Sequence, residues 1–246
     1  MKSTEAALEH SAAADQLRAR KDLLRLFKKA PMGEDDLLFN LGLFTRSGLL
    51  VKFLLLADIY KRFVHIPGVL CEFGTWYGQN AVLLENLRAI YEPFNRQRRI
   101  LAFDTFTGYT ESKFAGTGLY ATGTKYINYL DELLRCHERM NVYGHIPSGH
   151  ELIEGDVVHT APAYFREHQE VIVAFAFFDM GPYQPTYKAL QAIKPHLVKG
   201  SIILLDEPTL ADTPGEIIAF KHLFKPSEYR IEKCALYPSK AVVEIL

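Results

Sequence analysis

Short apolar runs alternate with amphipathic stretches along most of the chain. Five of the runs are rich in Val, Ile, Leu and Phe without polar alternation, which predicts strands buried on both faces. The stretches between them carry apolar residues three and four positions apart and predict helices. This alternation indicates an α/β fold, a doubly wound parallel sheet with helices on both faces. The predicted strands are Val69–Glu72, Ile100–Asp104, Glu151–Ile153, Val171–Asp179 and Ser201–Asp206, followed by a closing hairpin of Tyr229–Ala235 and Lys240–Ile245. The predicted helices are Gln79–Tyr91, Ala161–His168, Pro185–Leu197 and Gly215–Phe224.

The start of the chain has a different pattern. Apolar residues stand among Arg and Lys over Leu17–Phe27, which predicts an amphipathic helix, and Ser47 is a suitable N-cap for a second helix through Phe63. We therefore expect an N-terminal helical extension over residues 1–67 and a main domain over residues 68–246.

The segment Thr105–His150 (residues 105–150) has weaker periodicity, several glycines and many aromatic residues. A connection of this length inside a compact domain is usually functional or structureless. Because it follows the second predicted strand, we expect an inserted lid over a binding site. A surface insertion with no part in the chemistry is the alternative.

Composition narrows the choice of partner. The 246 residues are 48% hydrophobic and 23% charged, as in an ordinary soluble domain, and 28 basic against 29 acidic residues give a net charge of -1. This balance gives no electrostatic reason to expect a nucleic-acid or membrane partner, so a small molecule is favoured. The first residues lack the uninterrupted apolar core of a signal peptide, and we expect a cytoplasmic protein.

The ends of the predicted strands carry the candidate binding residues, since ligands of open α/β sheets lie beyond the carboxyl ends of the strands. The first strand runs into Glu72-x-Gly74-x-x-x-Gly78, where two glycines let the backbone turn and approach a ligand. A purely structural turn could need the same glycines. Asp104 ends the second strand, where an acid can accept hydrogen bonds from both hydroxyls of a ribose.

The third strand is followed by Gly155 and Asp156, which could offer a backbone amide and a carboxylate to an adenine edge. An ordinary Gly-Asp turn is the alternative.

Three more carboxylates follow the fourth and fifth strands, namely Asp179, Asp206 and Glu207. Like charges this close are unfavourable unless a cation neutralises them or one carboxyl is protonated, and Mg²⁺ is the natural partner for such oxygen ligands. We therefore expect a magnesium site here. The alternative is that these acids cap the helices that follow.

Several blocks in the same order resemble the macrocin O-methyltransferase-like family, sugar O-methyltransferases of the class I, S-adenosylmethionine-dependent type. The resemblance covers about residues 44–246. The blocks that carry it are Gly68-Val-Leu-Cys-Glu-Phe-Gly-Thr-Trp76, Ala89-Ile-Tyr-Glu-Pro-Phe-Asn95, Phe103-Asp-Thr-Phe-Thr-Gly108, Phe178-Asp179 with Tyr183-Gln-Pro-Thr186, and Leu205-Asp-Glu207.

The resemblance implies a Rossmann-like sheet in the order 3-2-1-4-5-7-6 and a bound S-adenosylmethionine. It also implies a divalent metal on Asp179, Asp206 and Glu207. We expect Asp179 to be the catalytic residue. The family's usual pattern after the fourth strand is D-x-D-x-Y, and this chain has Gly181 in place of the second acid. The resemblance implies cofactor contacts at Glu72, Gly74, Asp104 and Asp156, and we expect Thr75, Trp76, Thr105 and Gly155 to bind the cofactor beside them.

The expected reaction is methyl transfer from S-adenosylmethionine to a hydroxyl of a small-molecule sugar, assisted by Mg²⁺ that chelates vicinal hydroxyls of the acceptor. His137, His145 and His150 are candidate bases by chemistry, although lone histidines in such a segment are commonly surface residues. The alternatives are a metal-dependent catechol-type O-methyltransferase and a non-catalytic relative that binds cofactor or sugar. An NAD-dependent oxidoreductase is disfavoured by the missing G-x-G-x-x-G. A homo-oligomer is compatible with the sequence.

Overall fold

The computed structural model describes residues 13–109, 116–118, 120–123, 125–141, 149–206 and 214–246. The chain forms two compact units, Met1–Phe53 and Leu54–Leu246. Among the described residues, no helix combines the length and the apolar character needed to cross a membrane.

The described part of the first unit is helical and has no buried residue. Its elements are α2 (Ala14–Lys28), α3 (Glu34–Phe39), the 3₁₀ turn η1 (Leu41–Phe44) and the start of α4 (Ser47–Phe63). Phe27 of α2 packs edge-to-face on Phe44, with ring centroids 5.1 Å apart. The helices predicted over Leu17–Phe27 and Ser47–Phe63 are thus present as α2 and α4.

A seven-stranded sheet in the order β3-β2-β1-β4-β5-β7-β6 forms the second unit, as predicted. The five strands from β3 to β5 pair in parallel, and β7 runs antiparallel to both β5 and β6. The strand bounds are β1 Val69–Phe73, β2 Ile100–Asp104, β3 His150–Glu154, β4 Val173–Phe178, β5 Leu197–Leu205, β6 Tyr229–Lys233 and β7 Ala241–Ile245.

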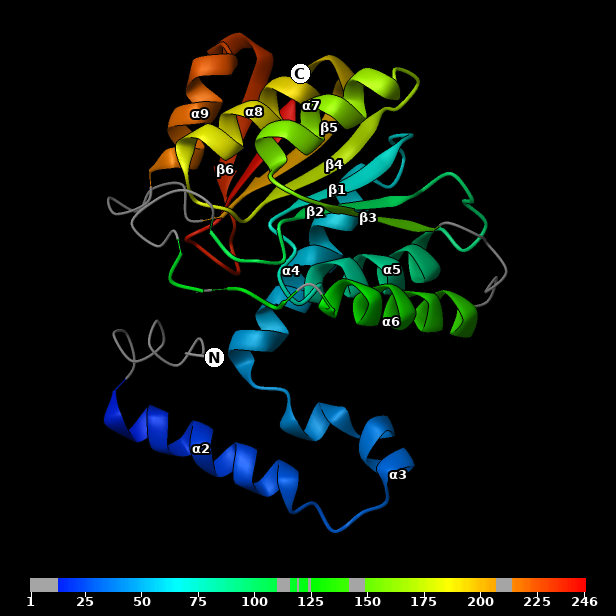
Figure 1. The fold of residues 1–246 in the computed structure, drawn as a ribbon, viewed down its shortest axis with the longest axis vertical. Coiled ribbons are helices and arrows are strands. Elements are labelled where there is room, and N and C mark those ends of the chain that lie inside the picture. The colour runs from blue at the N-terminus through cyan, green and yellow to red at the C-terminus, as the bar shows by residue number, and fades with distance from the viewer. Residues whose placement is uncertain (1–12, 110–115, 119, 124, 142–148, 207–213) are drawn as a thin grey trace. The chain divides into compact units, whose positions relative to one another are not determined.

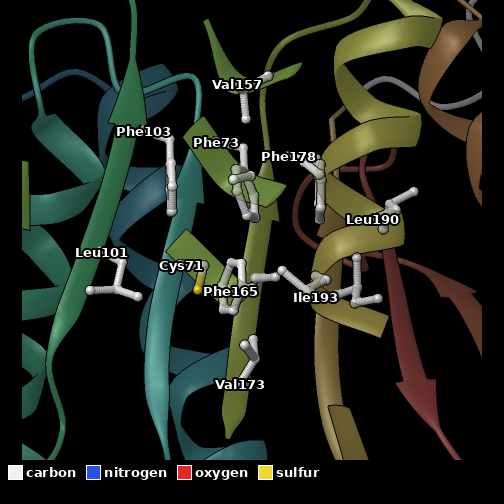
Figure 2. Packing of buried hydrophobic residues seen from close by; sticks show 14 of the residues in the cluster. Cys71, Phe73, Leu101, Phe103, Val157, Phe165, Val173, Phe178, Leu190 and Ile193 are labelled. Atoms are coloured by element: carbon white, nitrogen blue, oxygen red, sulfur yellow. The ribbon is translucent and has the colours of Figure 1, made fainter. Parts of the chain in front are cut away.

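Helices cover both faces of this sheet (Figure 1). One face packs against α7 (Val157–Glu167), α8 (Tyr183–Ile193) and α9 (Gly215–Leu223) in a core that includes the stacked rings of Phe73, Phe103 and Phe178 (Figure 2). The other face packs against the second half of α4, α5 (Gln79–Tyr91) and α6 (Tyr126–Met140). The short turns η2 (Lys194–His196) and η3 (Pro226–Glu228) precede β5 and β6. The predicted doubly wound class is therefore confirmed.

Helix α6 is the longest described helix that the sequence pattern did not predict; the short helix α3 was also not predicted. It lies inside the segment 105–150 and buries Leu130 and Leu134 completely in the core between the sheet and α5. Its apolar face is narrow and follows several glycines, so the periodicity of the whole segment is weak. This part of the segment is a packed structural helix.

Two other elements begin four residues earlier than predicted. Helix α7 starts at Val157 because the Asp156 carboxylate accepts the Val158 N–H at 2.9 Å and caps it. Strand β5 starts at Leu197, before Gly200, which has a φ of 90°. The helix predicted to reach Leu197 ends earlier as a result.

His150, the buried first residue of β3, links this strand to α6. Both ring nitrogens of His150 face carboxylates, Nδ1 at 2.6 Å from Glu138 and Nε2 at 3.0 Å from Asp131. Two acceptors require both nitrogens to carry hydrogen, which is the imidazolium form. Burial by itself would lower the pKa of His150, but the bonds to Glu138 and Asp131 outweigh it, and the pKa is raised.

We predict a pH-dependent contribution of His150 to stability. Since the folded pKa lies above the unfolded value of about 6.5, the contribution is complete below that pH and is lost as the pH rises through the folded value. His150→Gln should therefore lower the free energy of unfolding by about 1–2 kcal/mol at pH 6 and by less at pH 9. Urea denaturation of both proteins at the two pH values measures this, and an equal difference at both would contradict it.

Candidate functional site

The carboxyl ends of the strands form one transverse row of residues. Asp104 at the end of β2 lies in register with Glu154 of β3. The ladder continues one step beyond the other strands, because Gly74 donates its N–H to Phe103 O at 3.0 Å, Asp179 to Phe73 O at 2.9 Å and Asp206 to Phe178 O at 3.0 Å. We call this set the edge row: Glu154, Asp104, Gly74, Asp179 and Asp206.

Gly74 is the member of the edge row that has no side chain, and we call this position the gap. It lies between Asp104 and Asp179, at the point where the strand order reverses from β1 to β4, which is where ligands of doubly wound sheets bind. Its φ is 93°, and a Cβ here would lie 2.3 Å from the carbonyl oxygen of Asp179. Only glycine allows β1 and β4 to approach each other this closely.

Asp104 organises the turns on either side of Gly74. Its Oδ2 accepts the N–H of Trp76 at 2.6 Å and its Oδ1 accepts the N–H of Phe106 at 2.7 Å. Trp76 and Phe106 both have positive φ, 51° and 55°, which non-glycine residues rarely adopt. Burial raises the pKa of Asp104 despite these amide bonds. The carboxylate therefore holds two strained turns at the edge of the sheet.

Glu72 lies beneath the edge row, in register with Phe177 of β4 and fully buried. Its Oε1 accepts a hydrogen bond from Asn80 at 2.9 Å, and its Oε2 has no hydrogen-bond partner among the described residues. Burial, together with the nearby carboxylates of Asp179 and Asp104, raises the pKa of Glu72 to about 8 against the lowering effects of Asn80 and Thr75. A buried acceptor without a partner suits a cationic ligand group.

The remaining expected cofactor residues lie around Asp104. Gly155, with a φ of 132°, donates its N–H to Asp104 O at 2.9 Å, so the turn after β3 joins the turn after β2. Asp156 caps α7, as described above. Thr75 is buried and its Oγ1 lies 3.4 Å from Phe103 O, whereas Thr105 Oγ1 donates to Gly108 O at 2.8 Å. The fold thus brings together all eight residues expected at the cofactor.

Aromatic rings connect the turn after β1 to the segment 105–150. Trp76 packs edge-to-face on Tyr120, with centroids 5.4 Å apart, and Tyr77 packs edge-to-face on Tyr126 at 5.0 Å. Tyr126 also donates its hydroxyl hydrogen to Tyr77 O at 3.1 Å. The first turn of α6 therefore packs on the turn that follows β1. Sequence reasoning noted the aromatic content of the segment but not this contact.

The described histidines of the segment do not lie in the edge row. His150 begins β3, four residues before Glu154, which is about 13 Å along a strand. Its ring is also bound by Glu138 and Asp131, so the geometry does not favour His150 as the base. His137 lies on α6 with its Nδ1 3.3 Å from Asn86 Nδ2. His145 lies outside the described residues.

Asp179 and Asp206 are neighbours in the edge row, and Glu207 lies outside the described residues. The side chain of Asp179 is exposed. The carboxylate of Asp206 forms an ion pair with the ammonium of Lys240, which directly precedes β7 and is 4% exposed. The pair follows from register, because Leu205 faces Ala241 and the next step places Asp206 beside Lys240. Sequence reasoning missed Lys240, although a hairpin register could have indicated it.

Glu216 was also missed. It lies buried in the first turn of α9, and its Oε1 accepts the N–H groups of Met180 at 3.1 Å and Gly181 at 3.0 Å. Gly181 has a φ of 84°, so this backbone conformation disfavours the second acid of the D-x-D-x-Y pattern. The buried carboxylate instead fixes the loop that follows Asp179.

Two of the three expected magnesium ligands, Asp179 and Asp206, are among the described residues. Among residues 13–109, 116–118, 120–123, 125–141, 149–206 and 214–246, no three His, Cys, Asp or Glu side chains are grouped so that they could hold a metal ion. Asp206, one of the expected ligands, already holds a lysine ammonium. The described residues therefore do not fit the expected ion.

Comparison with solved structures gives relatives over almost the whole chain. The calicheamicin methyltransferase CalS11 is 33% identical, with a TM-score of 0.89 over 95% of this chain and 93% of that chain. An apo structure of CalS11, described as a TDP-rhamnose 3'-O-methyltransferase of calicheamicin biosynthesis, is 32% identical, with a TM-score of 0.85 over 95% of both chains. The O-methyltransferase NovP shares the fold at 14% identity, with a TM-score of 0.61 over 79% of each chain. No protein-family model and no curated protein matches the chain.

We predict that Gly74→Ala destabilises the protein by more than the conformational strain of an alanine. The new Cβ would lie 2.3 Å from Asp179 O, so β1 and β4 must separate. Gly181→Ala is the matched control, because its φ is also positive but no atom lies within 4 Å of a Cβ built there. We expect a loss of about 1–2 kcal/mol for Gly181→Ala and at least ~2 kcal/mol more for Gly74→Ala. Equal losses in urea denaturation would show that close approach is not the constraint.

Proposed function

The chain belongs to the macrocin O-methyltransferase-like family of class I sugar O-methyltransferases, and on this premise we propose that it methylates a hydroxyl of a small-molecule sugar. The activated methyl group comes from S-adenosylmethionine. The observation that carries the proposal is the gap at Gly74 in the edge row, with a carboxylate on each side. A nucleotide-like ligand entering this gap meets Asp104 on one side, and an acceptor hydroxyl meets Asp179 on the other.

The cofactor residues divide by the chemistry each offers. Asp104 is assigned to the ribose hydroxyls, because its carboxylate ends β2 next to Gly74 and is held in position by backbone amides. Glu72 receives the ammonium of the cofactor on its buried Oε2, which relieves the desolvation that raises its pKa. Gly155 and Asp156 face the adenine, and Thr75, Trp76 and Thr105 shape the two turns around it.

Asp179 is the proposed catalytic residue. Its side chain is exposed at the edge row next to Gly74, and the loop after it is fixed by Glu216. A carboxylate held there can orient an acceptor hydroxyl in line with the methyl group and take up its proton as the new C–O bond forms. General-base help of this kind is worth about 10²–10⁴ in rate.

The segment 105–150 completes the site in this proposal. The support for this is that Tyr120 and Tyr126 of the segment pack on Trp76 and Tyr77 of the turn after β1. We assign residues 68–246 to the methyltransferase domain and residues 1–67 to a helical extension. In this proposal the part of the segment outside α6 covers the acceptor and excludes water.

Magnesium is not part of this proposal. Asp206 is paired with Lys240, Gly181 stands where the family pattern has an acid, and Asp179 is the one expected ligand whose carboxylate faces solvent among the described residues. No step is assigned to a metal.

We expect methyl transfer to an acceptor sugar and not to catechols. Methyl-labelled S-adenosylmethionine is incubated with a panel of nucleotide sugars, glycosides and catechols, and the products are identified by mass spectrometry. Methylated catechols without methylated sugars would favour a catechol-type enzyme. Cofactor binding without any product from a broad panel would favour a non-catalytic relative.

Asp179→Asn should lower kcat about 10²–10³-fold, since the amide cannot accept the proton of the acceptor. Affinity for S-adenosylhomocysteine, measured by calorimetry, should change little. Glu167→Gln, an exposed acid on α7, is the control for removal of a surface charge and should retain full activity. Undiminished turnover in Asp179→Asn would remove Asp179 from the mechanism.

A further inference from the structure

Lys240 is a buried cation at the edge row. It is 4% exposed, its Nζ pairs with the Asp206 carboxylate, and it lies over the rings of Phe177 at 5.3 Å and Tyr237 at 4.9 Å. A lysine so far from solvent stays charged only when a carboxylate or similar acceptor compensates it. The charged form of Lys240 therefore depends on its ion pair with Asp206.

The sheet directs this pair toward the site. Phe177 belongs to the core between the sheet and α4, α5 and α6, and Glu72 lies in register with it. Asp179 and Asp206 follow Phe177 and Leu204 by two residues, so the pleat directs them to that same face. Lys240 is two residues before Val242, which packs in the same core. The ammonium thus lies on the face that carries the acids.

The acids of this face need a compensating charge. Glu72, Asp104, Asp179 and Asp206 stand at the ends of adjacent strands, and the pKa of Glu72 is raised to about 8, first by burial and then by the carboxylates of Asp179 and Asp104. Asp206 adds another carboxylate next to Asp179. The Lys240 ammonium neutralises Asp206 directly, and it does so with a charge built into the chain.

We infer that Lys240 is the fixed cation of the acceptor site, a positioning residue that holds Asp206 and makes a divalent metal unnecessary for methyl transfer. The part of this inference that concerns methyl transfer rests on the proposed function, whereas the competition for Asp206 does not. A carboxylate oxygen paired with a lysine cannot also coordinate a metal without displacing it, so the ammonium and a divalent ion compete for Asp206. Removing the ammonium should then create a metal requirement.

Metal binding tests the inference without any acceptor. Mn²⁺ binding is measured by electron paramagnetic resonance on the wild type, Lys240→Met and Lys240→Arg. We expect weak binding to the wild type and to Lys240→Arg, and at least tenfold tighter binding to Lys240→Met. The double variant Lys240→Met/Asp206→Asn should lose the gain. Tight stoichiometric Mn²⁺ binding to the wild type, or no change in Lys240→Met, would overturn the inference.

Activity provides the second readout. The wild type should keep its full rate in EDTA, and Lys240→Met should lose at least tenfold in kcat and recover part of it in millimolar Mg²⁺. Lys240→Arg, which keeps the charge, should need no metal. The melting temperature and the affinity for S-adenosylhomocysteine show whether each variant is folded. Loss of wild-type activity in EDTA with recovery in Mg²⁺ would overturn the inference, and a failure to find any acceptor would count against the proposed function while leaving the Mn²⁺ result decisive for Lys240.

Discussion

The close approach of β1 and β4 at Gly74 is the constraint on which the site depends. A Cβ at this position would lie 2.3 Å from Asp179 O, and the positive φ of Gly74 turns the chain away from the sheet. From there the chain passes through Trp76, whose N–H binds Asp104, and reaches α5 at Gln79. The same closeness sets Asp104 and Asp179 on either side of a residue without a side chain. One glycine contact therefore determines both the close approach of β1 and β4 and the positions of the two carboxylates on either side.

Charge compensation is the second condition for this edge of the sheet. Parallel strands bring their carboxyl ends together, and in this chain most of those ends carry acids. Three of the described acids are compensated in different ways: Asp104 by backbone amides, Glu216 by the amides of Met180 and Gly181, and Asp206 by Lys240. Glu72 keeps a buried oxygen without a partner among the described residues, and its pKa rises accordingly. The acid that lacks compensation is thus the one best placed to receive a cationic group.

Not every block that carried the family resemblance belongs to the site. The stretch around Glu92 follows α5, and Glu92 accepts hydrogen bonds from Arg98 Nε at 2.7 Å and Tyr60 Oη at 2.6 Å. Arg98 is almost fully buried and also donates to the carbonyl oxygens of Gly68 and Val64. This network ties the end of α4 and the start of β1 to the loop before β2. The block is therefore structural, and it lies at the amino ends of the strands.

The sequence by itself determined the class of fold, the strand order through its family resemblance, and the end of each parallel strand to within one residue. Those depend on local apolar periodicity and on chain order, which a sequence displays directly. Helix α6, the pairing of His150 with Glu138 and Asp131, the Glu216 contact with the loop after Asp179 and the ion pair of Lys240 with Asp206 were decided only by tertiary structure. Each joins residues distant in sequence or depends on burial, and Lys240 reaches Asp206 only because the antiparallel register of β5 and β7 brings them together. The charge of the site is set by such contacts, so the sequence could indicate the acids but not what neutralises them.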